Sequence, residues 1–130
     1  MKKIALIEDD KILSDSVYSG FKEAGFEVVR AFDGEEGLKL VETEKPDLVL
    51  LDILLPKLNG LQVAKQLKSN PSTKAIPIII LSVLDQSTSV AEALDSGVYE
   101  YIAKGDFKVE EIVAKVKEKF GKRGREHFLE

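Results

Sequence analysis

The chain has 130 residues, of which 44% are hydrophobic and 32% are charged, and its formal net charge is -4. This length fits a single domain with one sizeable core, and the acidic balance argues against direct binding to nucleic acid or to an anionic membrane. The absence of cysteine excludes disulfides, thiolate metal sites and a cysteine nucleophile. The apolar run at residues 4–7 is too short for a signal peptide, and no stretch approaches the length of a membrane span. We therefore expect a cytoplasmic domain.

Short apolar runs alternate along the chain with segments of helical periodicity. The runs are Ile4–Ile7, Phe26–Val29, Leu48–Leu51, Ile78–Leu81 and Val98–Ile102. Four of them are almost continuously apolar, which is typical of parallel strands covered by helices on both faces. The last run contains Glu100 and suits the edge of a sheet.

The segments between the runs predict five helices. Apolar residues recur every three or four positions near 13–24, 37–41, 61–67, 87–95 and 109–120, and Asp33 and Asp106 are suitable N-caps. Five strand–helix units with right-handed crossovers predict an α/β, flavodoxin-like fold, a doubly wound five-stranded parallel sheet of order 2-1-3-4-5 with five helices. We expect this domain to span residues 1–120, with 121–130 as a C-terminal tail or linker.

Polar side chains directly follow four of the predicted strands. Glu8-Asp9-Asp10 follow the first strand, Asp52 the third, Ser82 the fourth, and Lys104 comes just after the fifth. Because ligands of such sheets bind outside the carboxyl ends of the strands, these groups should converge in one crevice. Converging carboxylates repel each other unless a cation or proton intervenes, and an oxygen-only donor set suits Mg²⁺.

A cation, a carboxylate, a hydroxyl and a lysine together suit phosphoryl transfer onto the carboxylate. An acyl phosphate is an energetic product, so the donor must be reactive too, such as a phosphohistidine. The chain has no phosphate-binding glycine loop for ATP, and its single histidine, His127, lies in the predicted tail. The donor must therefore come from a partner.

Four stretches resemble the receiver domain of two-component response regulators, over about residues 1–120. They are Ile7-Glu8-Asp9-Asp10, Leu51-Asp52-Ile53-Leu54-Leu55-Pro56 with Asn59-Gly60, Ile80-Leu81-Ser82, and Tyr101-Ile102-Ala103-Lys104. The resemblance implies that Asp52 is the phosphoacceptor and that Lys104 pairs with the phosphoryl group. It further implies that Glu8, Asp9, Asp52 and the backbone carbonyl of Leu54 hold Mg²⁺, with Asp10 just outside. Ser82 and Tyr101 would be the switch hydroxyl and the switch aromatic.

The same resemblance implies the partners of the chain. A sensor histidine kinase or a phosphotransfer protein would supply the phosphoryl group, and a downstream partner would bind the face formed by helix four, strand five and helix five. Phosphorylation-dependent dimers are a further implied outcome, whereas direct contacts with nucleic acid or a membrane are not expected. Such a domain is a phosphoacceptor switch that assists its own phosphorylation and dephosphorylation, and is not an enzyme in the ordinary sense.

The sequence departs from the family pattern after the switch hydroxyl, where Val83 replaces a small residue, and after the lysine, where Gly105 replaces proline. These departures keep open a receiver-like interaction module that works without phosphorylation. Leu54 stands where haloacid-dehalogenase-type phosphatases need a second aspartate, and the acidic loop at residues 8–10 would repel a flavin phosphate. By the same resemblance, the hydrolytic water approaches between Leu54 and Leu84, which stand two residues beyond Asp52 and Ser82. Neither leucine can hydrogen-bond a water, which predicts slow dephosphorylation.

Overall fold

The computed structural model describes residues 1–82, 100–103 and 108–129, with side chains described throughout except at 82, 100, 101, 103 and 121–129. The strands are β1 (Lys3–Ile7), β2 (Glu27–Ala31), β3 (Leu48–Leu51), β4 (Ile78–Ser82) and β5 (Glu100–Ala103). The helices in these ranges are α1 (Lys11–Glu23), α2 (Gly34–Glu44), α3 (Gly60–Ser69) and α5 (Val109–Leu129). The helix predicted at residues 87–95 lies outside the described residues.

The strands form one parallel sheet in the order β2-β1-β3-β4-β5, which is the order predicted from the sequence. The register aligns the carboxyl ends of the three strands on the β2 side of the sheet. Ile7, the last residue of β1, pairs with Ala31 of β2 and with Leu51 of β3. The residues that follow these strands therefore emerge at the same edge, where open α/β sheets bind their ligands.

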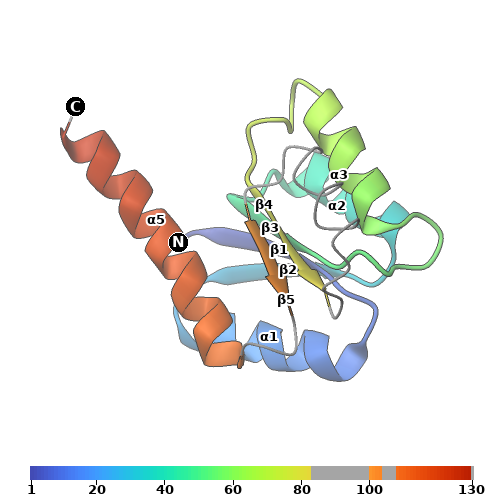
Figure 1. Cartoon of the computed structure of the whole chain (residues 1–130), viewed down its shortest axis with the longest axis horizontal. Helices are drawn as coiled ribbons and strands as arrows, with labels where there is room; N and C mark the ends of the chain where they lie inside the picture. Colours follow the sequence, from blue (N-terminus) through green and yellow to red (C-terminus); the bar gives the residue numbers. More distant parts are fainter. Residues whose placement is uncertain (83–99, 104–107, 130) are drawn as a thin grey trace.

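Helices cover both faces of the sheet, with α1 and α5 on one face and α2 and α3 on the other (Figure 1). Successive residues of β1 point to opposite faces, so Ile4 and Leu6 pack against the α1–α5 side while Ala5 and Ile7 pack against the α2–α3 side. All four are buried completely or almost completely. Burial on both faces explains the nearly continuous apolar runs in the sequence.

Asparagine and aspartate side chains begin three of the helices. Asp33 caps α2 by accepting a hydrogen bond from the Glu36 amide at 2.8 Å, as predicted. Asp10 caps α1, and Asn59 forms a reciprocal capping box with Gln62 at the start of α3. The cap predicted at Asp106 lies outside the described residues.

Several element boundaries differ from the sequence prediction by one or more residues, and two of these differences are informative. The strand predicted from Phe26 begins at Glu27, and Phe26 instead packs its ring on Phe21 with a centroid separation of 5.3 Å. Its hydrophobicity therefore signals the core and not the strand. Helix α5 was expected to end near Phe120 but continues to Leu129. The added segment contains no proline and has several strong helix formers, so propensity favours continuation despite its two glycines.

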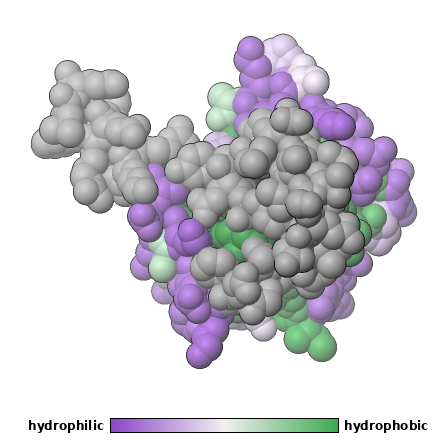
Figure 2. Space-filling model, viewed as in Figure 1, coloured by the Kyte–Doolittle hydropathy of each residue, from purple (hydrophilic) through white to green (hydrophobic). Residues whose placement is uncertain are grey.

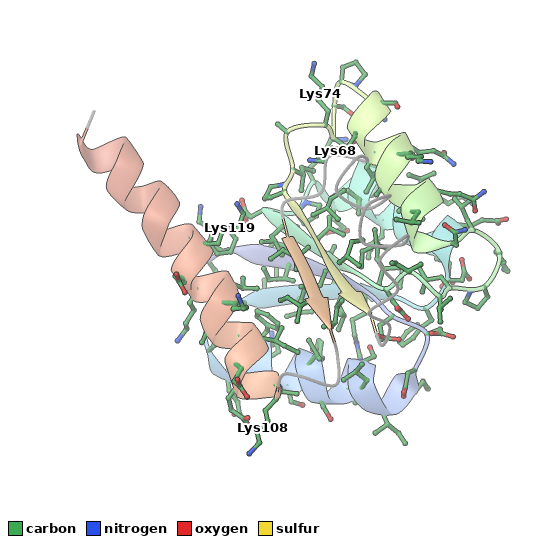
Figure 3. All side chains as sticks on the ribbon, viewed as in Figure 1. Lys68, Lys74, Lys108 and Lys119 are labelled. Atoms are coloured by element: carbon green, nitrogen blue, oxygen red, sulfur yellow. The ribbon has the colours of Figure 1, made fainter. Side chains whose placement is uncertain are left out.

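At the amino ends of the strands, opposite the crevice, hydrogen bonds hold the turn between α3 and β4. Lys68 near the end of α3 donates hydrogen bonds to the carbonyl oxygens of Lys74 at 3.1 Å and Ile76 at 2.8 Å, and thereby fixes the turn that leads into β4 (Figure 3). Partial burial lowers the pKa of the Lys68 ammonium. None of the helices in the described ranges combines the length and apolar character needed to cross a bilayer.

Candidate functional site

Three carboxylates converge at the carboxyl ends of β1 and β3. One oxygen each from Glu8, Asp9 and Asp52 lies within 4.8 Å of the others. The backbone fixes this approach, because the Glu8 amide donates to Ala31 at 3.1 Å and the Asp52 amide donates to Ile7 at 3.0 Å. Both acidic residues thus extend the parallel ladder by one residue before the chain turns away.

Burial makes this cluster costly without a positive partner. Glu8 is only 1% exposed and Asp52 only 4%, whereas Asp9 is exposed. Three negative charges at this spacing and burial favour a bound cation or a proton. Among the side chains that the structure describes, the converging ligand atoms are all carboxylate oxygens, which hard divalent cations such as Mg²⁺ prefer. The residues present therefore fit a magnesium ion.

Asp10 has a different role from its two acidic neighbours. Its Oδ1 atom accepts hydrogen bonds from the Ile12 amide at 3.0 Å and the Leu13 amide at 3.2 Å, which satisfies the free amides at the start of α1. Its own amide donates to Oε2 of Glu8 at 3.1 Å and helps to orient that carboxylate. Asp10 therefore caps α1 and helps to orient Glu8, and its place just outside a coordination shell stays a prediction.

A tight loop carries the chain from Asp52 to the start of α3. The Leu55 amide donates to Ile53 at 3.0 Å, and the Gly60 amide returns to the same Ile53 carbonyl at 2.8 Å. Leu54 lies within this loop, two residues beyond Asp52, and is 55% exposed. The assignment of its carbonyl as a metal ligand remains the prediction drawn from the resemblance.

The loop is also fastened to the start of α2. The Gly34 amide donates to the Pro56 carbonyl at 3.2 Å, and a β-carbon at Gly34 would overlap the Leu58 carbonyl oxygen. Lys57 adopts a φ of 68°, a conformation that costs a residue with a side chain roughly 1–3 kcal/mol. Its Nζ lies 3.6 Å from Oδ2 of Asp33. The loop therefore has two attachments to α2, one through the backbone and one through an ion pair.

Electrostatics at Asp33 agree with this arrangement. The hydrogen bond from the Glu36 amide lowers the pKa of the Asp33 carboxyl, and the nearby Lys57 ammonium lowers it further. Desolvation acts in the opposite direction but does not prevail. Asp33 is therefore a charged cap that also faces the loop.

The remaining predicted site residues are only partly within the described structure. Ser82 is the last residue of β4 and pairs with Ala103 of β5, so its backbone lies at the edge from which the acidic cluster emerges. Tyr101 lies in β5 opposite Ile80. Their side chains are not described, and the described residues do not include Lys104, Val83, Leu84 or Gly105. The roles of Ser82, Tyr101 and Lys104 therefore stay predictions.

Sequence reasoning did not identify two residues that shape the site. Gly34 and Lys57 hold the loop after β3 against α2, but neither follows a strand directly. A signal for Gly34 was present, because an Asp-Gly pair precedes a helix at that point. The signal for Lys57 was absent, because a lysine in a loop gives no indication of its backbone conformation.

Comparisons with known proteins agree with this geometry. The family described as the response regulator receiver domain matches residues 4–117. The DNA-binding dual master transcriptional regulator RpaA of Synechocystis is 38% identical over 117 residues, which are 90% of this chain and 48% of that protein. The chain spans about half the length of the curated relatives it matches.

Two solved structures are similar in both fold and sequence. The Mn²⁺-bound form of response regulator Rcp1 has a TM-score of 0.80 and 28% identity, covering 90% of this chain and 92% of that one. The phosphorylated cyanobacterial phytochrome response regulator RcpA has a TM-score of 0.79 and 30% identity, covering 90% and 91%.

The parallel sheet, the acidic cluster at its carboxyl edge and the match over residues 4–117 together define a signalling receiver module. The chain belongs to the response regulator receiver domain family. Its cluster of Glu8, Asp9 and Asp52 is compatible with Mg²⁺ and with phosphorylation.

Proposed function

We propose that this chain is a cytoplasmic receiver that accepts a phosphoryl group on Asp52 from a phosphohistidine of a sensor kinase or phosphotransfer protein. The observation that carries the proposal is the convergence of Asp52 with Glu8 and Asp9 at the carboxyl edge of the sheet. The relative solved in phosphorylated form and the relative solved with Mn²⁺ support the same chemistry.

In the proposed reaction, a carboxylate oxygen of Asp52 attacks phosphorus while the bond from phosphorus to the donor imidazole nitrogen breaks. The electron pair of that bond stays on the imidazole, and Asp52 becomes an acyl phosphate. A bound Mg²⁺ would supply positive charge to the phosphoryl oxygens. Glu8 and Asp9 would hold that ion together with Asp52 and the Leu54 carbonyl. Lys104 and Ser82 would neutralise the remaining phosphoryl oxygens.

The conformational response to phosphorylation is proposed to occur at β4 and β5, away from the β2 side of the sheet. The added charge of roughly -1.5 to -2 would draw the Ser82 hydroxyl inward and let the ring of Tyr101 follow. The face formed by the segment after β4, β5 and α5 would then bind a downstream partner or a second phosphorylated copy. No direct contact with nucleic acid or membrane is proposed for these 130 residues.

The alternative is a receiver-like module that binds its partner without phosphorylation. A single assay separates the two functions: acetyl phosphate or a phosphorylated histidine donor is added to wild type and to Asp52→Asn, with Mg²⁺ or with EDTA. We expect stoichiometric phosphorylation only in wild type with Mg²⁺. Equal labelling of Asp52→Asn, or labelling that EDTA leaves unchanged, would overturn the site assignment. A wild type that never accepts phosphate while binding its partner would favour the alternative.

A further inference from the structure

The attachment of the β3–α3 loop to α2 contains one contact that stability alone does not explain. Lys57 holds a strained backbone conformation with φ of 68°, and its side chain reaches Asp33 at 3.6 Å. The Lys57 side chain is 59% exposed, and exposed ion pairs contribute little to stability. A glycine at this position would avoid the strain. Stabilisation of the folded state therefore does not explain why a lysine occupies this position.

The position of the pair indicates what that contribution is. The loop is short, and Lys57 lies three residues after Leu54, whose carbonyl is the proposed ligand from this segment. Asp33 is a firm anchor, because its carboxylate is only 13% exposed and is already fixed by the Glu36 amide. The neighbouring bond from Gly34 to Pro56 fastens the same part of the loop.

We infer that Lys57 is a positioning residue, whose ion pair with Asp33 holds the loop in the conformation that presents the Leu54 carbonyl to the divalent cation. This inference rests on the proposed function and deepens it, because it names what regulates the affinity of the acidic cluster for Mg²⁺. The start of α2 then influences the metal site through two contacts with the loop, the ion pair from Asp33 and the hydrogen bond from Gly34.

For Lys57, a purely electrostatic effect and a positioning effect predict different changes in Mg²⁺ affinity; for Asp33 they predict the same change. A positive charge on Lys57 repels a divalent cation, so removing it should leave Mg²⁺ binding unchanged or stronger if charge alone matters. If the pair positions the loop, the same change should weaken binding. Removing the negative charge of Asp33 weakens binding in both cases. Lys57→Met is therefore the informative variant, and it keeps a long unbranched side chain at a backbone position that penalises branching.

The experiment is a double-mutant cycle on the unphosphorylated protein, with the Mg²⁺ dissociation constant measured by calorimetry for wild type, Lys57→Met, Asp33→Asn and the double variant. Asparagine keeps the α2 cap. We expect each single variant to bind roughly threefold more weakly, which is within what a largely exposed ion pair can supply. The double variant should be no weaker than either single one, and Lys57→Arg should restore most of the affinity.

A matched control and a structural readout complete the test. Lys3→Met makes the same charge change at the start of β1, where Lys3 pairs with Glu44 at 3.0 Å, and should leave Mg²⁺ affinity unchanged. In wild type, Mg²⁺ should shift the amide resonances of Gly34 and Leu58, and this shift should shrink in Lys57→Met. Unchanged or tighter binding by Lys57→Met, with wild type binding normally, would overturn the positioning role alone. A wild type that binds no Mg²⁺ would overturn both this role and the proposed metal site.

Discussion

Gly60, the first residue of α3, lies directly against the backbone carbonyl of Asp52. A β-carbon at position 60 would overlap the Asp52 carbonyl oxygen and would crowd the α-carbon of Ile53 at 2.8 Å. The close approach lets the Gly60 amide donate to Ile53 and folds the loop back on itself. The absence of a side chain at Gly60 thus sets where the candidate phosphoacceptor sits.

Gly60→Ala should therefore displace the Asp52 backbone. We expect a loss of about 1–3 kcal/mol in the free energy of unfolding, as for other overpacked sites, together with slower phosphorylation. Urea unfolding and labelling by acetyl phosphate would measure the two effects. Gly25→Ala is the matched control, because Gly25 has a φ of 93° but no atom within 4 Å of an added β-carbon. The control should lose stability through backbone strain and keep its phosphorylation rate. If Gly60→Ala also keeps its phosphorylation rate, Gly60 does not set the position of Asp52.

An exposed isoleucine beside the acidic cluster predicts where the phosphodonor docks. Ile12 is 82% exposed in the first turn of α1, and Figure 2 shows a hydrophobic protrusion over the start of this helix. Ile12→Ser should slow transfer from a phosphohistidine protein roughly fivefold, the effect of losing about 1 kcal/mol of contact. Phosphorylation by acetyl phosphate should not change, because that donor needs no docking surface. Slowing with both donors, or with neither, would rule out a docking role for Ile12.

The half-exposed Leu54 predicts a long-lived acyl phosphate. Hydrolysis needs a water held in line behind phosphorus, and a leucine offers that water no hydrogen bond. Leu54→Asn should shorten the phosphoryl half-life about fivefold, which corresponds to one added hydrogen bond of about 1 kcal/mol. Leu54→Met is the control, since it keeps an apolar side chain of similar volume, and its half-life should match wild type. An equal or longer half-life in Leu54→Asn would remove the basis for this prediction.

The lowered pKa of Asp33 predicts a specific dependence of stability on pH. A carboxyl whose pKa is lower in the folded state than its ordinary value of 3.8 contributes stability above that value, and this contribution is lost as pH falls through the folded-state pKa. The stability advantage of wild type over Asp33→Asn should thus be largest near neutral pH and shrink on acidification toward about pH 3. Urea unfolding of both proteins across this range provides the measurement. A difference that is constant or grows on acidification would show that the charge on Asp33 does not stabilise the fold.

The strands of the sheet could be predicted from the sequence because a strand buried on both faces is apolar at nearly every position. Runs such as Ile4–Ile7 and Leu48–Leu51 are apolar without alternation, and acidic residues follow each of them at once. The runs predict buried parallel strands, and the acidic residues after them predict the meeting of Glu8 with Asp52. The strand order came from the succession of strand–helix units with right-handed crossovers. The N-cap at Asp33 was also predictable, since aspartate before a helical segment is a local signal.

The parts that escaped prediction depend on tertiary contact. The apolar stripe of α5 ends near Phe120, whose ring still contacts Phe26, but the helix continues to Leu129 and extends beyond the sheet (Figure 1). Phe26 reads as a strand residue, yet its ring contacts Phe21 and Phe120 from outside β2. The contact between Gly34 and Leu58 joins the start of α2 to the loop after β3, two segments that no sequence pattern relates.

The most direct test of the central claim is to locate the phosphoryl group by chemistry. The protein is phosphorylated with acetyl phosphate and Mg²⁺, the acyl phosphate is reduced with borohydride, and the peptides are analysed by mass spectrometry. The account predicts that the aspartate at position 52 alone is converted to homoserine, with Asp9 and Asp10 intact. Conversion at Asp9 in place of Asp52, or no converted peptide in protein that has demonstrably bound Mg²⁺, would contradict the assignment of Asp52 as the phosphoacceptor.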